Sequence, residues 1–348
     1  MGAPLLLLIF AAAAAATWVA GVYLSRTTDA IDIRLGLGDA LGGMILLAIA
    51  GSLPELAVTV SGALAGNLDL VAGNLIGGIA VQTATLVICD FFVSGKRPLS
   101  HLVGSLIPVL EASVVIMVVS VVLMGALLPA SVSVGSASPA SIAAVVLWLL
   151  GIYVLNRARK APRWEASAPG SRPGRPHRRV AHPDQPHPFS KASTGRVVLI
   201  FVAGCVITLI AGALLEITGN ELANRAGLNG VVFGATVLAL ATSLPEISSG
   251  IAAVRLGDHQ LVMSDVFGGN AFQVCLFLVA DLVAGRPVLP SLGHANSWLA
   301  GVGIVLTAVY AAAVILRPQR RILRLGGDSL IVVVIFAIGI LGLIAVSR

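Results

Sequence analysis

Two long apolar stretches of this chain are each interrupted by the same four residues, and this repeat restricts the fold more than any other feature. Ser52-Leu53-Pro54-Glu55 returns as Ser243-Leu244-Pro245-Glu246, 191 residues later. Proline removes a backbone hydrogen bond from a helix, and a glutamate is costly at membrane depth, so each is unusual in such surroundings. Finding both at matched places in two halves indicates an internal duplication.

The match between the halves continues beyond these four residues. At the same offset Asn74 aligns with Asp265, each 19 residues after its glutamate and shortly before a Gly-Gly pair. Other aligned pairs are Ala48 with Ala239, Ala50 with Ala241, Gly66 with Gly257, Gly77-Gly78 with Gly268-Gly269, Gln82 with Gln273 and Asp90 with Asp281. The matched segments, about 37–92 and 229–284, are therefore expected to build one site between them.

Apolar runs long enough to cross a bilayer recur along nearly the whole chain, which is 57% hydrophobic and 11% charged with a mean hydropathy of +0.98. Because the runs are continuous rather than alternating, they favour transmembrane helices over a β-barrel. We predict an all-α polytopic membrane protein with ten transmembrane helices, at about 4–24, 37–65, 68–92, 102–127, 141–155, 197–215, 231–254, 261–284, 295–316 and 330–346. The second span would be about 43 Å long, which exceeds a core of about 30 Å, and we expect it to tilt or break at Pro54.

The number and charge of the loops predict the topology. Five spans per half is an odd number, so the second half is expected to enter the membrane upside down, as an inverted repeat. With the N-terminus outside, 19 of the 22 Lys and Arg residues fall on the inner side and only Arg225, Arg286 and Arg348 on the outer side. The positive-inside rule then predicts a cell-membrane protein with both termini outside. A cleaved signal peptide is not expected, because nothing basic precedes the first apolar run.

The chain divides into a first repeat at 1–156, a basic cytoplasmic linker at 157–195 and a second repeat at 196–348. The linker is rich in Arg, Pro, His and Ser, and its only acids are Glu165 and Asp184, too few for a calcium-sensing domain. We interpret it as a solvated tether, with binding to anionic lipid headgroups as the open alternative. The net charge of +6 comes from short loops and does not indicate nucleic-acid binding. Cys89, Cys205 and Cys275 lie in apolar spans and are interpreted as small packing residues.

The two breaks carry the chemistry of a cation site. Each proline leaves carbonyls near Ala50 and Gly51, or near Ala241 and Thr242, without their usual helical donors. Together with a carboxylate and hydroxyls within one turn, these carbonyls form an all-oxygen environment, which suits hard cations such as Ca²⁺ and Na⁺. The candidate ligands are Glu55, Glu246, Asn74, Asp265, Gly51, Ser52, Thr242, Ser243, Ala48 and Ala239, with Gln82, Gln273 and Glu111 as auxiliary residues.

Three other acids within the predicted spans need an explanation. Asp90 and Asp281 lie near the ends of their spans, where a capping or interface role is at least as reasonable as transport. Glu111 has no acidic counterpart in the second half. It is either a proton-carrying or auxiliary acid or a buried neutral carboxyl hydrogen-bonded to a neighbour, and we favour the latter.

At these residues the chain resembles the sodium/calcium exchanger family of cation antiporters, whose inverted repeats each carry a Ser-x-Pro-Glu break and a Gly-Asn/Asp-x-x-Gly-Ser-Asn segment. The corresponding segments here are Gly73-Asn74-Leu75-Ile76-Gly77-Gly78-Ile79 and Ser264-Asp265-Val266-Phe267-Gly268-Gly269-Asn270. The resemblance implies that Glu55 and Glu246 hold Ca²⁺ with neighbouring carbonyls. It also implies that Asn74 and Asp265 join the glutamates in binding the counter-ions.

The chain departs from the family pattern mainly by losing hydroxyl groups. Gly51 stands where the family often has threonine, and Leu70 and Leu261 stand where sodium exchangers tend to place serines. Gly78 and Gly269 replace the serine after the second glycine of the family segment, Ile79 replaces an asparagine, and Gln82 and Gln273 replace another. The calcium-type centre is retained, while the counter-ion is left open between Na⁺ and H⁺.

We therefore expect a transporter and not an enzyme: an antiporter that exchanges Ca²⁺ for monovalent cations, Na⁺ first, by alternating access and as a monomer. By resemblance spans 1 and 6, whose few polar residues include Thr17 and Thr208, slide across the site. A proton-coupled exchanger of Ca²⁺ or another divalent cation is the alternative, and a cation channel is more remote, because the internal duplication argues against rings of identical subunits. No nucleophile-base or metal-pair motif supports an intramembrane hydrolase.

Overall fold

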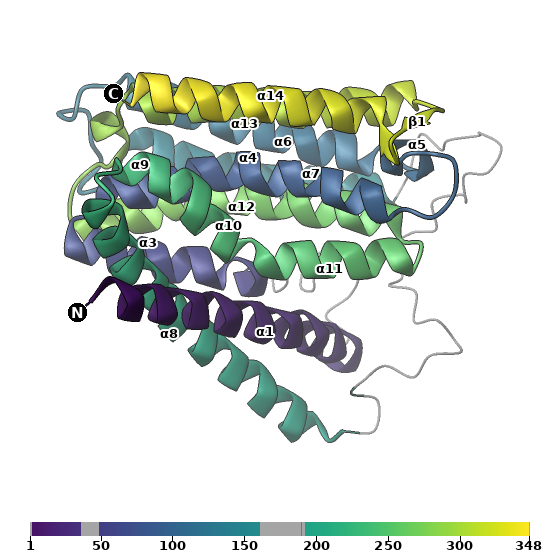
Figure 1. Cartoon of the computed structure of the whole chain (residues 1–348), viewed down its shortest axis with the longest axis horizontal. Helices are drawn as coiled ribbons and strands as arrows, with labels where there is room; N and C mark the ends of the chain where they lie inside the picture. Colours follow the sequence, from purple (N-terminus) through teal and green to yellow (C-terminus); the bar gives the residue numbers. More distant parts are fainter. Residues whose placement is uncertain (1, 36–48, 161–188, 190–191, 348) are drawn as a thin grey trace.

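The computed structural model describes residues 2–35, 49–160, 189 and 192–347, and within them it is almost entirely helical (Figure 1). The first half contains α1 (Ala3–Leu35), α3 (Leu53–Ala65), α4 (Leu68–Phe92), α5 (Leu99–Leu102), α6 (Ile107–Ala126) and α7 (Pro139–Lys160). The second half contains α8 (Thr194–Arg225), α9 (Gly230–Phe233), the π-helical turn η2 (Gly234–Leu238), α10 (Ala239–Thr242), α11 (Leu244–Arg255), α12 (His259–Ala284), the 3₁₀ turn η3 (Leu289–Ser291), α13 (His294–Leu316) and α14 (Gly327–Val346). The predicted all-α class is confirmed, apart from a short hairpin of β1 (Arg321–Ile322) and β2 (Leu325–Gly326).

The described residues contain eight helices that are long and apolar enough to cross a membrane, or nine if Gly230–Thr242 and Leu244–Arg255 form one bent span. This agrees with a polytopic membrane protein. The predicted span at 37–65 lies partly outside the described residues, so the total of ten spans stays a prediction.

The predicted spans 1 and 6 end well before the helices that contain them. The first helix runs on to Leu35 rather than ending near residue 24, and α8 runs on to Arg225 rather than ending near residue 215. A fall in hydropathy does not end a helix by itself, and no proline is present in either extension. The hydroxyls of Thr27 and Thr218 donate back to carbonyls of their own helices, which is usual for threonines inside a continuous helix.

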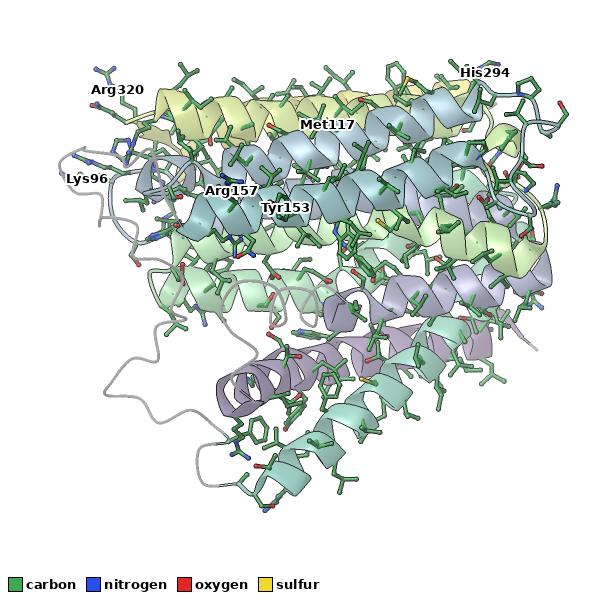
Figure 2. The ribbon with its side chains drawn as sticks, turned by 180° about the vertical axis from the view of Figure 1, so that it is seen from behind. Lys96, Met117, Tyr153, Arg157, His294 and Arg320 are labelled. Carbon is green, nitrogen blue, oxygen red and sulfur yellow. The ribbon has the colours of Figure 1, made fainter. Side chains whose placement is uncertain are left out.

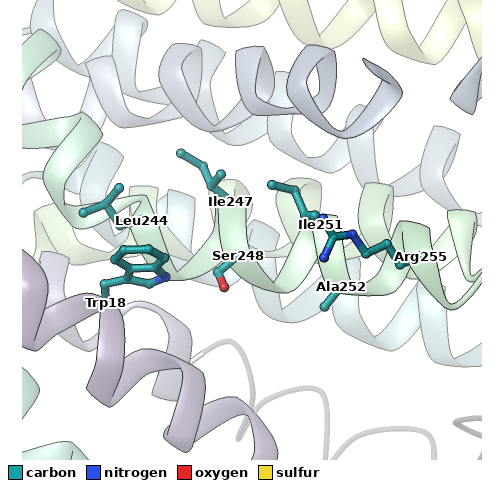
Figure 3. A pocket seen from close by; sticks show the side chains of 7 residues that line it. All are labelled: Trp18, Leu244, Ile247, Ser248, Ile251, Ala252 and Arg255. Carbon is teal, nitrogen blue, oxygen red and sulfur yellow. The ribbon is translucent and has the colours of Figure 1, made fainter. Parts of the chain in front are cut away.

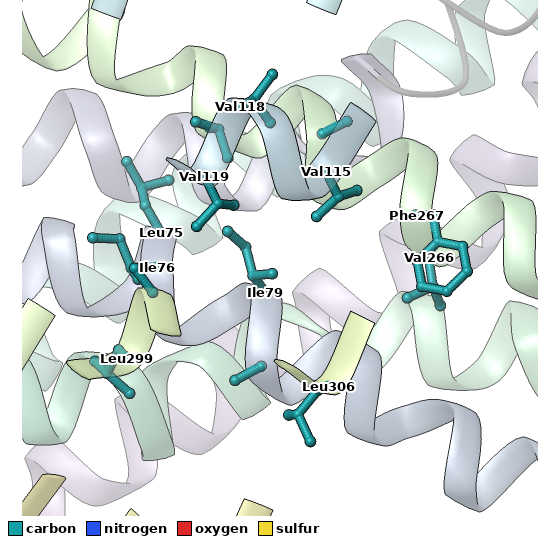
Figure 4. Packing of buried hydrophobic residues seen from close by; sticks show 14 of the residues in the cluster. Leu75, Ile76, Ile79, Val115, Val118, Val119, Val266, Phe267, Leu299 and Leu306 are labelled. Carbon is teal, nitrogen blue, oxygen red and sulfur yellow. The ribbon is translucent and has the colours of Figure 1, made fainter. Parts of the chain in front are cut away.

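The core of the bundle is built around α4, most of whose residues are buried. In Figure 4, Leu75, Ile76 and Ile79 of α4 lie among the valines of α6 and the leucines of α13. Lipid tails are as apolar as these side chains, so close packing must hold such helices together. A Cβ on Gly73 would lie 2.6 Å from the carbonyl oxygen of Val231, so α4 and α9 touch backbone to backbone.

The two long helices α1 and α8 form a pair beside this bundle (Figure 1). They join it through a second apolar cluster, made by Ala13, Val58, Leu70, Ala211, Leu215, Ala223, Phe233, Leu238 and Ala241. Figure 1 also shows α3 and α11 pointing to opposite ends of the bundle. Lys96 and Arg320 lie at one end and His294 at the other (Figure 2).

Candidate functional site

The helix break in the second half lies between α10 and α11, whose axes differ by 47°. Pro245 is the second residue of α11 and has no N–H to donate. On one side of the break the Ser243 N–H donates to the Ala239 carbonyl, and on the other side the Ile247 N–H donates to the Ser243 carbonyl. Because Pro245 has no N–H, the Ala241 carbonyl one turn before it loses its usual helical donor. Whether a cation uses this oxygen stays a prediction.

The break in the first half has the same form where it is described. Ser52 separates the helical residues 49–51 from α3, and the Leu56 N–H donates to its carbonyl at 2.9 Å. Ala48 lies outside the described residues. Gly51 is half-buried, and no described atom lies within 4 Å of a Cβ placed on it. At the matched position of the second half, Thr242 is fully buried.

The two glutamates lie near enough to interact electrostatically. Glu55 lies in the first turn of α3 with 1% of its surface exposed, and Glu246 lies in the first turn of α11 and is partly exposed. Glu246 interacts electrostatically with Glu55 and with Asp265. In both glutamates Oε2 is buried, and no described residue donates a hydrogen bond to it. Buried carboxylate oxygens without partners are costly, so this arrangement is suited to a cation.

Asn74 makes a contact between the two halves, whereas Asp265 makes one within the second half. Thr242 of α10 donates to Asn74 Oδ1 of α4 at 3.4 Å, a long bond that crosses between the repeats. Ser249 of α11 donates to Asp265 Oδ2 of α12 at 3.1 Å. Asn74 is fully buried, and its Nδ2 has no partner among the described residues. Through these contacts Asn74 lies beside α10 and Asp265 lies beside α11.

The remaining candidate ligands differ in whether their oxygen atoms already accept hydrogen bonds. The Ala239 carbonyl already accepts from Ser243 N, from Ser243 Oγ at 2.7 Å and from Thr242 Oγ1 at 3.2 Å. All these bonds lie within the second helix break. The main role of Ala239 and Ser243 is therefore to stabilise that break. Ser52 is buried at 6% exposure.

The two glutamines, which match in sequence, occupy different surroundings. Gln82 Nε2 lies 3.4 Å from Glu55 Oε1, whereas Gln273 Nε2 donates to the Asn74 and Leu75 carbonyls at 3.2 and 2.9 Å. A Cβ on Gly78 would lie 2.2 Å from Gln273 Nε2, so this glycine makes room for the amide. Gln273 therefore ties α12 to α4.

Glu111 lies away from these residues, on α6. Arg159 Nη2 of α7 donates to its Oε1 at 2.6 Å, and Glu111 is 2% exposed. The hydrogen-bonding neighbour that the sequence analysis predicted for Glu111 is thus an arginine. Since a guanidinium stays protonated, the contact is an ion pair rather than a neutral hydrogen bond.

Glu216 is a buried acid that the sequence reasoning missed. It is fully buried on α8, where it accepts from Ser61 at 2.9 Å and from Asn67 at 2.6 Å. The predicted span ended at residue 215, so Glu216 was assigned to a loop. Continued helical periodicity beyond residue 215 was the signal that could have found it.

Asp90 and Asp281 hold loops at the ends of α4 and α12. Asp90 accepts from the N–H groups of Leu99 and Gly326 and from the Ser329 hydroxyl. Asp281 accepts from the N–H groups of Ser138 and Val288. Both carboxylates are fully buried and occupied by these donors, which supports the capping interpretation.

We expect Asp90→Asn to lower stability by about 2–4 kcal/mol, because an amide N–H₂ would face donors that now meet a carboxylate oxygen. Calcium transport by the variant that remains folded should be unchanged. Thermal unfolding in detergent and flux in proteoliposomes measure the two effects. A shift in ion dependence at unchanged stability would contradict the capping role.

A cavity of about 350 Å³ lies between α1 and α11 (Figure 3). Trp18 lines it from α1, and Leu244, Ser248 and Arg255 are among the α11 residues opposite. Glu246 and Asp265 are partly exposed, while Glu55 and Asn74 are buried. Solvent therefore reaches the second-repeat side of the site more easily than the first-repeat side.

Comparison with known proteins agrees with the resemblance that the sequence motifs indicate. The family model described as "Sodium/calcium exchanger protein" matches residues 5–157 and 196–345. The putative antiporter CaxA of Alkalimonas amylolytica is 25% identical over 316 residues, which cover 87% of this chain and 88% of that protein. The inner membrane protein YrbG of Escherichia coli (strain K12) is 29% identical over 89 residues, 26% of each chain.

Two kinds of solved exchanger share the fold at low sequence identity. The crystal structure of the H⁺/Ca²⁺ exchanger CAX aligns with a TM-score of 0.67 and 14% identity, covering 98% of this chain and 87% of that one. A structure of the sodium-calcium exchanger NCX_Mj aligns with a TM-score of 0.60 and 13% identity, covering 98% and 99%. Because the family model matches both halves, the chain belongs to the sodium/calcium exchanger family, in the calcium:cation antiporter superfamily, and is a membrane cation antiporter rather than an enzyme.

Proposed function

We propose that this protein exchanges Ca²⁺ for a monovalent cation, Na⁺ in the first instance, by alternating access. The observation that carries the proposal is the pair of buried Oε2 atoms of Glu55 and Glu246, one from each half, that no described residue satisfies. A Ca²⁺ ion between them would satisfy both, together with the carbonyls freed at the two breaks. Asn74 and Asp265 would complete the site for the counter-ions.

The same charges explain why exchange would be coupled. Glu55, Glu246 and Asp265 would place three negative charges in one partly dry site, which opposes movement of the empty carrier. Ca²⁺ or several monovalent ions would neutralise the site and permit switching. Because both kinds of ion would use the same ligands, they would compete rather than leak.

The architecture that we propose is ten spans in two inverted repeats, at 1–156 and 196–348, joined by a cytoplasmic linker. Both termini would be outside, and the protein would work as a monomer. Partial exposure of Glu246 and Asp265 fits a state open on one side. We assign that side to the cytoplasm, because α11 runs from Glu246 to Arg255 and basic loops are retained inside.

Coupling to H⁺ instead of Na⁺ is the second candidate. It is favoured by the hydroxyls missing at Leu70, Leu261, Gly78 and Gly269. The fold does not decide between them, because both an H⁺/Ca²⁺ exchanger and a sodium-calcium exchanger share it. Calcium flux in proteoliposomes under imposed Na⁺, K⁺ or pH gradients tests the proposal. Flux that ignores every opposing cation would indicate a channel instead.

Asp265→Asn separates the roles of the site residues. We expect it to shift the dependence on the counter-ion by about tenfold and the apparent affinity for Ca²⁺ by less, because the glutamates retain the two charges nearest Ca²⁺. Ser249 can still donate to the remaining amide oxygen. Titrations of Ca²⁺ and of the counter-ion on the same vesicles measure this. A larger change in calcium affinity would overturn the division of roles.

A further inference from the structure

The internal repeat extends into the two long helices beside the site. At the same offset of 191 residues, Thr17 of α1 aligns with Thr208 of α8, and Gly21 aligns with Gly212. Both threonines are fully buried. The duplicated part of each half therefore includes a helix that lies outside the two site segments.

Each of these helices packs against the helix break of the opposite repeat. A Cβ on Gly21 would lie 2.5 Å from Pro245 Cβ, and a Cβ on Gly212 would lie 2.9 Å from the Pro54 carbonyl oxygen. Figure 1 shows α1 running in the same direction as α10 and α11, and α8 in the same direction as α3. Each threonine lies one helical turn before its glycine on the same face.

Helix geometry then gives the level of each threonine along the opposite helix. One turn before Pro245 is Ala241, and one turn before Pro54 is Ala50; these residues would normally accept from the N–H that proline lacks. Because the paired helices run in the same direction, we expect Thr17 to lie level with Ala241 and Thr208 to lie level with Ala50.

The hydroxyls of Thr17 and Thr208 also differ from most others on these helices. Buried helical threonines usually donate to a carbonyl of their own helix, as Thr27 and Thr218 do. Within the described residues, the Thr17 and Thr208 hydroxyls have no hydrogen-bond partner. Thr28 and Thr59 share this property, but glycine stands at their matched positions, so only the Thr17–Thr208 pair is duplicated.

We propose that Thr17 and Thr208 are oxygen ligands of the monovalent coupling cation, each acting with the proline-released carbonyl of the opposite repeat. A hydroxyl and a carbonyl are neutral oxygen donors, which suit Na⁺, whereas Ca²⁺ is held mainly by carboxylates. The two hydroxyls supply the type of ligand that is missing at Leu70 and Leu261. This inference rests on the proposed exchange of Ca²⁺ for Na⁺. It adds that α1 and α8 bind the ion directly.

The test compares Thr17→Val and Thr208→Val, singly and together, with Thr27→Val and Thr218→Val as matched controls. The controls remove buried hydroxyls that donate within their own helices. In proteoliposomes we expect the double variant T17V/T208V to raise the Na⁺ concentration for half-maximal Na⁺-driven Ca²⁺ flux about tenfold. The Ca²⁺ dependence should change less than about twofold. Thr17→Ser and Thr208→Ser should keep the wild-type Na⁺ dependence.

A second measurement does not depend on transport. Na⁺ should raise the thermal unfolding temperature of the wild-type protein in detergent, and T17V/T208V should require about tenfold more Na⁺ for the same rise. Equal Na⁺ dependence in T17V/T208V and T27V/T218V would overturn the inference. Wild-type flux driven by pH and not by Na⁺ would overturn it while leaving exchange intact. Wild-type vesicles without any cation-driven Ca²⁺ flux would instead overturn the proposed function.

Discussion

Glu55→Gln and Glu246→Gln should each reduce Ca²⁺ transport by about 100-fold or more, while leaving the fold intact. Each substitution removes one carboxylate charge from a site in which the second glutamate alone cannot neutralise Ca²⁺. The amide has the shape of the carboxyl group, and no described residue depends on the Oε2 atom that it changes. Loss of charge rather than loss of packing would therefore cause the defect. Calcium uptake in proteoliposomes measures it.

Glu221→Gln is the matched control, because Glu221 is exposed and pairs with Arg225 on the surface of α8. Such pairs contribute little, so its transport should equal that of the wild type. Thermal unfolding in detergent gives a second readout. Ca²⁺ should stabilise the wild-type protein and E221Q, but neither E55Q nor E246Q. Wild-type flux from either site variant would refute the site.

Gly234→Ala should have the largest effect on stability. A Cβ at this position would lie 2.5 Å from the Leu70 carbonyl oxygen and 3.0 Å from the Asn74 N–H nitrogen. Both are backbone atoms of α4, which cannot rotate away as a side chain can. We expect a loss of about 3 kcal/mol or more. Transport should also be lost, because α4 carries Asn74 into the site.

Gly268→Ala is the control for this prediction. Gly268 lies on α12 near Asp265, and no described atom lies within 4 Å of a Cβ placed on it. Its thermal unfolding should match that of the wild type. If G234A unfolds at the same temperature as G268A, the backbone contact between η2 and α4 does not limit stability.

The sequence predicted much of the candidate site because the duplication is local. A proline and a glutamate in an apolar run must break the helix and must be shielded from lipid, wherever the rest of the chain goes. The partner segments could be found by their constant offset from the glutamates. The ends of α1 and α8 could not be found in this way, because hydropathy falls where a helix leaves the lipid and not where it stops. Glu216 was missed for that reason.

The sequence could not predict which residues far apart in the chain contact each other. The matched glutamines show this most clearly: Gln82 lies beside Glu55, whereas Gln273 crosses to the backbone of α4 in the space left by Gly78. Asp90 and Asp281 also depend on N–H groups from distant loops. Two repeats that share a sequence pattern can therefore make different contacts.

The sequence by itself determined the membrane class, the two breaks and the acids at their centre, because these follow from the cost of polar groups in an apolar run. Only the tertiary structure decided which oxygens are left without partners. It pairs the hydroxyl of Ser243 with its own helix and leaves those of Thr17 and Thr208 unpaired beside the opposite repeat. The reason is that hydrogen bonds are satisfied by neighbours in space, and packing of the two halves chooses those neighbours.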